Sequence, residues 1–311
     1  MRVLSTVTMN KNISADSCGF VAASEGNYLK HIEKTAESLA EYETEKPIIL
    51  LSGPSGSGKT TSAFRLRDKL CEMGIKTRAL SMDNYFLSVD DPRNEREPDG
   101  SIDFESPKRL DFDLLNEHLE KLWSGEEFTL PVFDFANQKQ IKGKQFQRKE
   151  HEMVILEGIH ALNPDVTGSV SERASGVYVS VRTRMKSKTG AILHPSKIRL
   201  MRRLSRDKLF RGREASQTLK FFEKVQEGEK KHILPYKCYA EHDIDTFLGY
   251  ETAVYKSVIE EDLQALRYSY DEFDKYEGMM IILQELLNVD LEKVPDNSLV
   301  REFAGGSTFE Y

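Results

Sequence analysis

Residues 47–60 read PIILLSGPSGSGKT, and this stretch decides the fold. Residues 48–51 form an apolar run that is too short for a helix and is soon followed by Gly53. Such a run is typical of a strand buried on both faces of a parallel sheet. Residues 53–60 then match GxxxxGK[ST] in full. Because the glycines let successive amides point at phosphate oxygens before a helix N-terminus, the pattern predicts a nucleoside triphosphate site.

The residues of this loop have separate expected roles. Lys59 is expected to bridge the outer phosphates, and the Thr60 hydroxyl is expected to ligate Mg²⁺. An ordinary glycine-rich turn is the alternative, and the position between a buried strand and a helix argues against it. The residues expected to bind the nucleotide are Gly53, Ser55, Gly56, Ser57, Gly58, Lys59, Thr60 and Thr61.

The segments around the loop continue the alternation of strands and helices. Apolar residues at helical spacing predict a helix after the loop that stops at Gly74. Short apolar runs predict further strands at 77–82, 153–156 and 176–181. This β-loop-α-β order is typical of an α/β fold, a doubly wound parallel sheet flanked by helices. One amphipathic helix is expected at 27–42, and residues 197–227 and 257–290 are expected to be helical.

Composition and charge limit the classes of protein that fit. With 311 residues, 39% hydrophobic and 31% charged, the chain suits a globular enzyme and excludes collagen, a coiled coil and a disordered chain. The formal charge of 44 − 51 = −7 argues against a chain devoted to nucleic acid or anionic membranes. Three widely spaced cysteines without a CxxC argue against a disulfide framework or a zinc site. We expect a soluble, cytoplasmic protein without nucleic-acid or membrane partners.

Two acidic residues directly follow predicted strands. A carboxylate at Glu157 can hold Mg²⁺ through water or orient it. Asp83 follows the strand at 77–82, and the strands of a doubly wound sheet end at the ligand crevice. There Asp83 can accept the proton of an acceptor hydroxyl as it attacks a phosphoryl group. The alternatives are an exposed glutamate at a strand end and an aspartate that caps a helix.

Cationic side chains are concentrated in residues 197–213, where eight of seventeen residues are Lys or Arg. A solvated basic face or a nucleic-acid patch is the ordinary interpretation of such a segment. In an acidic chain we favour an arginine-rich lid that neutralises the charge on a transferred phosphoryl group, because guanidinium groups suit that task. The arginines at helical spacing are Arg199, Arg202, Arg203 and Arg206, with Arg211 and Arg213 after them.

Six motifs along the chain share their order and spacing with one known family. They are GPSGSGKTT (53–61), SMDNYF (81–86), DFESP (103–107), PVFDF (131–135), LEGIHALNP (156–164) and RRLSRDKLFRGR (202–213). Together they resemble the uridine kinase and phosphoribulokinase family of P-loop kinases. The C-terminal stretch SLVREFAGGSTF (298–309) is similar to that of bacterial uridine (nucleoside) kinases within this family. The resemblance implies an ATP-dependent phosphorylation of a hydroxyl, usually the 5′-hydroxyl of uridine or cytidine.

The resemblance also implies a division of the chain and the roles of several residues. An N-terminal helical extension (1–46) precedes a P-loop kinase domain (47–255), and a C-terminal helical extension and tail (256–311) follow. Asp83 becomes the catalytic base, and Glu157 lies by the magnesium. The residues that grip ATP phosphates and the transferred group are Arg203, Arg206, Arg211 and Arg213, and Arg203 and Arg206 with Lys59 are expected to be catalytic.

The acceptor site departs from the family pattern. The ribose-binding acid corresponds to Glu105, with Asp103 as a near alternative, since either carboxylate can accept two hydroxyl hydrogen bonds. The positions that read the base hold Phe133 and Gln138 instead of tyrosine and histidine. Phe133 can stack on a ring without a hydroxyl to offer, while Gln138 can both donate and accept. Tyr85 of SMDNYF is expected to line the same substrate site.

Three functions remain open at this stage. The favoured one is a magnesium- and ATP-dependent kinase that acts on uridine or cytidine. The nearest alternative acceptor is another small alcohol, such as ribulose 5-phosphate, pantothenate or glycerate; Arg93 and Arg96 are available for an acceptor that already carries a phosphate. A nucleotide-dependent regulatory or binding protein is the third, and the complete set of catalytic residue types argues against it. Related kinases are often homo-oligomers.

Overall fold

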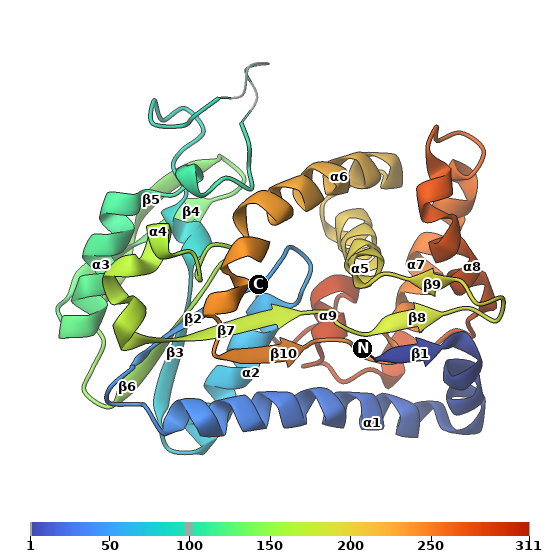
Figure 1. The fold of residues 1–311 in the computed structure, drawn as a ribbon, viewed down its shortest axis with the longest axis horizontal. Coiled ribbons are helices and arrows are strands. Elements are labelled where there is room, and N and C mark those ends of the chain that lie inside the picture. Colours follow the sequence, from blue (N-terminus) through green and yellow to red (C-terminus); the bar gives the residue numbers. More distant parts are fainter. Residues whose placement is uncertain (1, 97–99, 101, 311) are drawn as a thin grey trace.

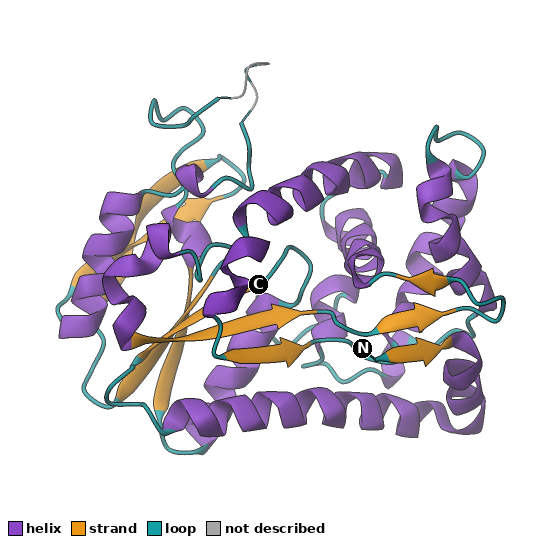
Figure 2. Ribbon diagram, in the orientation of Figure 1, coloured by secondary structure: helices purple, strands orange, loops and turns teal. Residues whose placement is uncertain are grey.

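The computed structural model describes residues 2–96, 100 and 102–310. Among these residues, five parallel strands form a central sheet in the order β10-β7-β2-β6-β3, with helices on both faces (Figure 1; Figure 2). The predicted α/β fold is confirmed. The strands are β2 (Ile48–Ser52), β3 (Lys76–Ser81), β6 (Glu152–Glu157), β7 (Ala174–Ser180) and β10 (His242–Asp245).

Strand β2 shows why a continuous apolar run predicted the sheet correctly. Successive side chains of a strand point to opposite faces. Ile49 and Leu51 pack into a core that includes α1 (Thr6–Ala40) and α2 (Lys59–Glu72). Ile48 and Leu50 pack into a second core that includes α3 (Phe112–Ser124). Because both faces are covered, residues 48–51 are all apolar, and the one polar residue of the strand, Ser52 at its end, donates a hydrogen bond to the Ile159 carbonyl at 2.9 Å.

The N-terminal helix is longer than the predicted span of 27–42. Helix α1 runs along one whole side of the molecule and is interrupted at Asp16, whose φ of −160° and ψ of 93° are not helical (Figure 1). Its first half carries apolar residues such as Met9 and Val21 among many polar ones, so its periodicity is weak. Although α1 is 35 residues long, no helix of the described residues is long and apolar enough to cross a membrane.

The basic segment, predicted to be helical over 197–227, consists of two helices. Helix α5 (Pro195–Phe210) ends before Gly212, whose φ of +58° favours glycine, and α6 (Ala215–His232) then begins. The backbone carbonyl of Asp207 accepts hydrogen bonds from the amides of Arg211 and Arg213, both at 3.1 Å, and this closes the turn. The region predicted to be helical at 257–290 likewise contains α7 (Glu251–Leu266), the 3₁₀ turn η5 (Phe273–Tyr276) and α8 (Glu277–Glu285).

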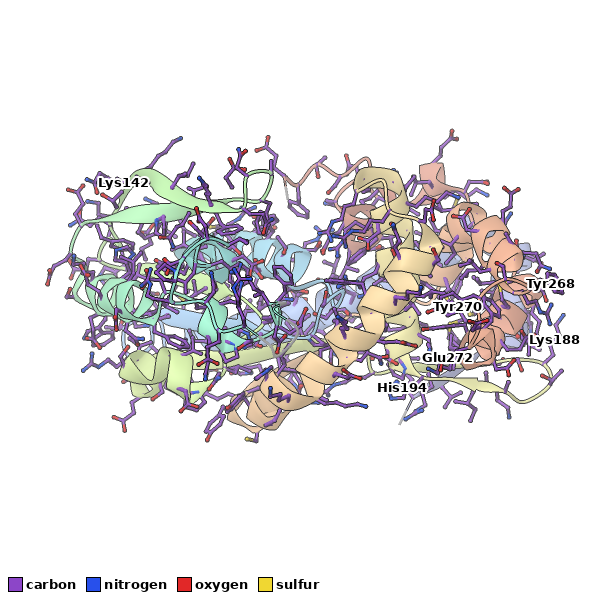
Figure 3. All side chains as sticks on the ribbon, turned by 90° about the horizontal axis from the view of Figure 1, so that it is seen from above. Lys142, Lys188, His194, Tyr268, Tyr270 and Glu272 are labelled. Atoms are coloured by element: carbon purple, nitrogen blue, oxygen red, sulfur yellow. The ribbon has the colours of Figure 1, made fainter. Side chains whose placement is uncertain are left out.

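Several short or exposed elements were not predicted. In the hairpin of β4 and β5, one face is solvated, and this hairpin with Lys142 lies at the opposite end of the long axis from Lys188 and Tyr268 (Figure 3). Strand β1 pairs parallel with β8, which pairs antiparallel with β9, in a small separate sheet. The unpredicted elements are β1 (Val3–Ser5), β4 (Phe128–Asp134), β5 (Lys139–Phe146), β8 (Arg184–Lys186), β9 (Ile192–Leu193), α4 (Pro164–Thr167) and α9 (Leu299–Ala304), besides α3 and β10.

Candidate active site

A cavity of about 270 Å³ lies where the glycine-rich loop faces the carboxyl ends of β3 and β6. A larger cavity of about 510 Å³ between α3 and the β4–β5 hairpin contains none of the predicted site residues. The smaller cavity is therefore the candidate active site. The predicted residues that line it are Ser55, Gly56, Gly58, Lys59, Thr60, Asp83, Glu105, Glu157, Arg203, Arg206, Arg211 and Arg213.

The glycine-rich loop is held in place from outside the cavity. Gly53 passes so close to β7 that a Cβ there would lie 2.1 Å from the Val179 carbonyl oxygen, so a larger residue does not fit. Gly53, Ser57 and Thr61 form the base of the loop and do not line the cavity. Side chains from α5 and from the residue after β10 donate hydrogen bonds to three successive backbone carbonyls of the loop. These bonds are Arg199 Nη1 to Ser55 O at 2.8 Å, Arg202 Nη1 to Gly56 O at 3.1 Å and Thr246 Oγ1 to Ser57 O at 2.7 Å.

Two carboxylates meet at the ends of neighbouring strands. Asp83 lies in the 3₁₀ turn η1 (Met82–Tyr85) directly after β3, and Glu157 is the last residue of β6. Burial and the Asp83 charge raise the pKa of Glu157 to about 7. Burial also raises the pKa of Asp83, against the opposing effect of Lys59. Two acids that resist ionisation together are stabilised in their charged forms by a cation, so this pair suits a divalent ion.

The residues present fit a magnesium ion that arrives with a nucleotide. Within the described part of the chain, no group of three or more His, Cys, Asp or Glu side chains is placed to hold a metal. Mg²⁺ is commonly held by one or two carboxylates together with waters and substrate phosphates. Thr60, Asp83 and Glu157 line one cavity and supply a hydroxyl and two carboxyl groups.

The opposite wall of the cavity is cationic. Arg203 and Arg206 each keep a buried Nε without a hydrogen-bond partner among the described residues. Burial and the charges of Arg211 and Arg203 lower the pKa of Arg206 to about 10. Buried cations that repel one another are stabilised by an anion. The chemistry of the wall formed by Arg203, Arg206, Arg211 and Arg213 therefore fits phosphate groups.

Asp207 is a site residue that the sequence analysis did not predict. Its carboxylate is fully buried and lies 3.3 Å from Arg211 Nη1 and 3.6 Å from Arg213 Nη1. Thr218 Oγ1 donates to the same carboxylate at 3.2 Å. Asp207 thus fixes two of the arginines at the edge of the cavity. The available signal was that it is the only acid within the basic segment 197–213.

The acid on the acceptor side of the cavity is Glu105. Its Oε2 is buried without a partner among the described residues, and burial and the Glu229 charge raise its pKa to about 7. Asp103, the alternative acid, instead accepts from the Glu105 amide at 3.0 Å and lies 3.3 Å from His232 Nε2. Of the two acids, the structure brings Glu105 to the cavity. The aromatic rings beside it belong to Phe86 and Phe104.

Glu105→Gln should alter stability in a pH-dependent way. The pKa of Glu105 is raised from about 4.5 to about 7 in the folded chain, so folding takes up a proton between these pH values. Its carboxyl therefore costs stability above about pH 7, and the cost disappears below about pH 4.5. We expect the melting temperature of Glu105→Gln relative to the wild type to rise between pH 5 and pH 7 and then to level off. A difference that is constant from pH 5 to pH 8 would contradict the assignment.

Besides Asp103, three further predicted substrate residues do not line the cavity. Tyr85 is 1% exposed, and its hydroxyl lies 3.0 Å from Nδ1 of His118, so its polar group already has a partner in the core. The Phe133 ring contacts the ring of Phe86, with centroids 5.8 Å apart, and of the two only Phe86 lines the cavity. Gln138 lies in the β4–β5 turn with a φ of +54°, and its amide donates to Phe135 O at 2.8 Å. The structure therefore does not bring these three residues to the cavity that contains Asp83.

The parallel sheet, the glycine-rich loop at the start of α2 and the paired acids at the strand ends define a P-loop nucleotide-binding protein of the α/β class. The arginine wall and Asp83 distinguish a phosphotransferase from a switch protein. The chain belongs to the phosphoribulokinase/uridine kinase family, whose model matches residues 48–252. It is a kinase that transfers a phosphoryl group to an alcohol.

Several known proteins are similar to this chain. The uridine kinase of Borrelia turicatae is 32% identical over 195 residues, which cover 62% of this chain and 84% of the relative. The uridine kinase of Halobacterium salinarum is 25% identical over 193 residues, which cover 61% of this chain and 76% of the relative. Among solved structures, the D-glycerate 3-kinase of Cryptococcus neoformans is 16% identical, with a TM-score of 0.40 over 70% of this chain and 87% of that one.

Proposed function

We propose that this kinase transfers the γ-phosphoryl group of ATP to the 5′-hydroxyl of uridine or cytidine, with Mg²⁺ bound beside the nucleotide. One observation carries the proposal. The Asp83 carboxylate lies in the same cavity as Lys59 and the four arginines Arg203, Arg206, Arg211 and Arg213. A base that faces a phosphate site is what phosphoryl transfer to a hydroxyl requires.

Each wall of the cavity has a separate task in this reaction. Lys59 and the amides of the glycine-rich loop bind the phosphates, and the arginines neutralise the charge that spreads over the transferred group. Asp83 accepts the proton of the attacking hydroxyl at its carboxylate. Thr60 and Glu157 would hold Mg²⁺, and the ion would supply positive charge that offsets the negative charge on the phosphates. Because Gly53 packs on β7 and α5 braces the loop, these groups are positioned before substrate binds.

The chemistry of the acceptor side favours an uncharged sugar. Glu105 accepts hydrogen bonds, which the hydroxyl groups of a ribose can donate. Phe86 and Phe104 offer aromatic faces to a base. Arg93 and Arg96, the arginines considered for an acceptor that already carries a phosphate, contact other groups of the protein. Arg93 pairs with Asp91 at 2.9 Å and with Asp111 at 3.1 Å, and Arg96 Nη1 donates to Gly100 O at 3.0 Å. The uridine kinase relatives support the same acceptor class.

An acceptor panel tests the proposal directly. ADP formation from MgATP is measured with uridine, cytidine, adenosine, pantothenate, glycerate and ribulose 5-phosphate, and the product is identified by phosphorus NMR. We expect uridine or cytidine to raise ADP formation well above the rate without acceptor and to give a 5′-monophosphate. Acceleration by glycerate or pantothenate alone would overturn the assignment to a nucleoside.

Lys59→Ala should weaken nucleotide binding and phosphoryl transfer together. Its ammonium group is expected to contact the phosphates in the ground state and in the transition state. We expect kcat/KM for ATP to fall by about 10²–10³-fold, the usual cost of one lost electrostatic contact at a reacting group. Lys142→Ala, on the exposed strand β5, is the control and should behave as the wild type. Equal losses in both variants would contradict the role of Lys59.

A further inference from the structure

The C-terminal helix α9 is fastened to the helix that follows the glycine-rich loop. Leu299 packs so closely on the loop that a Cβ at Gly58 would lie 2.4 Å from Leu299 Cδ1. Thr61 Oγ1 donates a hydrogen bond to Glu302 Oε2 at 2.6 Å. Just before α9, the carbonyl of Asn297 accepts from Arg65 Nη2 at 2.6 Å. The C-terminal segment thus borders the predicted phosphate site.

Helix α9 also contacts the helix that carries the arginine wall. Ser205 Oγ donates to Phe303 O at 3.0 Å. The guanidinium groups of Arg202 and Arg206 lie 5.5 Å and 5.6 Å from the centroid of the Phe303 ring. Helix α9 therefore lies between the two elements that are expected to hold the phosphates, α2 and α5.

The position of α9 is determined by its own hydrogen bonds. Arg301 Nη2 donates to the carbonyl oxygens of Leu291 at 2.9 Å and Val294 at 2.7 Å. Ser298 caps the helix by accepting from the Val300 amide at 3.1 Å, and its hydroxyl donates to the buried Glu25 of α1 at 2.5 Å. These hydrogen bonds fix the position of α9, and they therefore fix the position of the Glu302 side chain as well.

Glu302 adds a carboxylate to the phosphate side of the cavity. Glu302 lines the cavity together with Lys59, Thr60 and Arg206. Its charge raises the pKa of Glu157 and opposes the lowering of the pKa of Arg206, so it acts on both sides of the site. An ionised carboxylate only accepts hydrogen bonds, and phosphate oxygens of MgATP have none to donate. Glu302 and a bound polyphosphate therefore repel each other.

We propose that Glu302 is an affinity-determining residue of the nucleotide site. Its carboxylate accepts the hydrogen bond of the Thr61 hydroxyl and repels the phosphates of ATP and ADP. This inference rests on the proposed function. Glu302 keeps nucleotide affinity below the level that the glycine-rich loop and the arginines alone would give. Tight binding of ATP and ADP alike does not accelerate the chemical step, whereas weaker binding of ADP speeds its release.

Glu302→Gln removes the charge and keeps the shape and an acceptor oxygen for Thr61. The affinity for MgADP is measured by isothermal titration calorimetry, and KM is measured for ATP and for the acceptor. We expect the Kd for MgADP and the KM for ATP to fall by about tenfold, the size of effect that a nearby like charge produces. The KM for the acceptor should not follow this change. Glu302→Asp keeps the charge and should show no gain in affinity.

A gain in nucleotide affinity is a result that a merely structural role of Glu302 does not produce. Glu302→Ala also removes the charge and must change affinity in the same direction, so either folded variant decides the matter. Glu292→Gln, at an exposed position before α9, is the control. An unchanged or raised Kd for MgADP in Glu302→Gln, with normal binding by the wild type, would overturn the inference alone. Failure of the wild type to bind MgADP would overturn the proposed function as well.

Discussion

Asp83→Asn is expected to lower kcat by about 10²–10⁴-fold, the usual contribution of a general base. The asparagine amide has nearly the size of the carboxyl but cannot accept the proton of the attacking hydroxyl. The nucleotide contacts of Lys59 and the arginine wall remain in place. We therefore expect the Kd for MgATP to stay within a few-fold of the wild-type value, as measured by calorimetry beside single-turnover kinetics.

The matched control for Asp83→Asn is Asp90→Asn, since the Asp90 side chain is 74% exposed. This variant should retain wild-type turnover. The pH dependence gives a second readout, because burial raises the pKa of Asp83 and the neighbouring Glu157 has a pKa of about 7. Activity of the wild type should fall as the pH drops through the range in which this pair takes up protons. If Asp83→Asn turned over at the wild-type rate, Asp83 would not be the base.

Local sequence patterns were sufficient to predict the centre of this fold. The run at 48–51 is apolar at every position because both faces of β2 are covered. Such an uninterrupted apolar run can be recognised in the sequence without any knowledge of the neighbouring elements. The hairpin strand β5 has one solvated face and a lysine-rich sequence, so nothing in it resembles a buried strand. The turn between α5 and α6 is closed by hydrogen bonds from the amides of Arg211 and Arg213 to the Asp207 carbonyl. Helical periodicity in the sequence does not reveal these contacts.

The candidate site was predictable where a residue's role follows from its neighbours along the chain. Lys59 and Thr60 belong to one continuous motif, and Asp83 and Glu157 lie where two neighbouring strands end at the same edge of the sheet. Glu302 could not be predicted in this way, because it reaches the cavity from a helix 241 residues after Thr61 in the sequence. Helical spacing alone did not separate the arginines, since Arg199 and Arg202 share it with Arg203 and Arg206 but pair with Glu229 and Glu251; only the family resemblance assigned the phosphates to Arg203 and Arg206.

Arg202→Ala is the change expected to cost most stability. Arg202 is fully buried on α5, and its Nε and Nη2 bind the Glu251 carboxylate at 2.6 Å and 3.0 Å. Its remaining donors bind Gly56 O at 3.1 Å and Thr246 O at 2.7 Å. Removing the arginine leaves Glu251 as an uncompensated buried charge, which typically costs about 3–5 kcal/mol. We expect a loss of this size in the free energy of unfolding measured with urea.

The control for Arg202→Ala is Arg182→Ala, because Arg182 pairs with Asp243 where both side chains are about 40% exposed. An exposed pair is worth about 0–1 kcal/mol, so this variant should unfold almost as the wild type does. The double variant Arg202→Met/Glu251→Leu removes both charges and should recover much of the lost stability. Because Arg202 also holds the Gly56 carbonyl, the double variant should still bind nucleotide less well than the wild type. Full recovery of both stability and nucleotide affinity would show that Arg202 does not brace the glycine-rich loop.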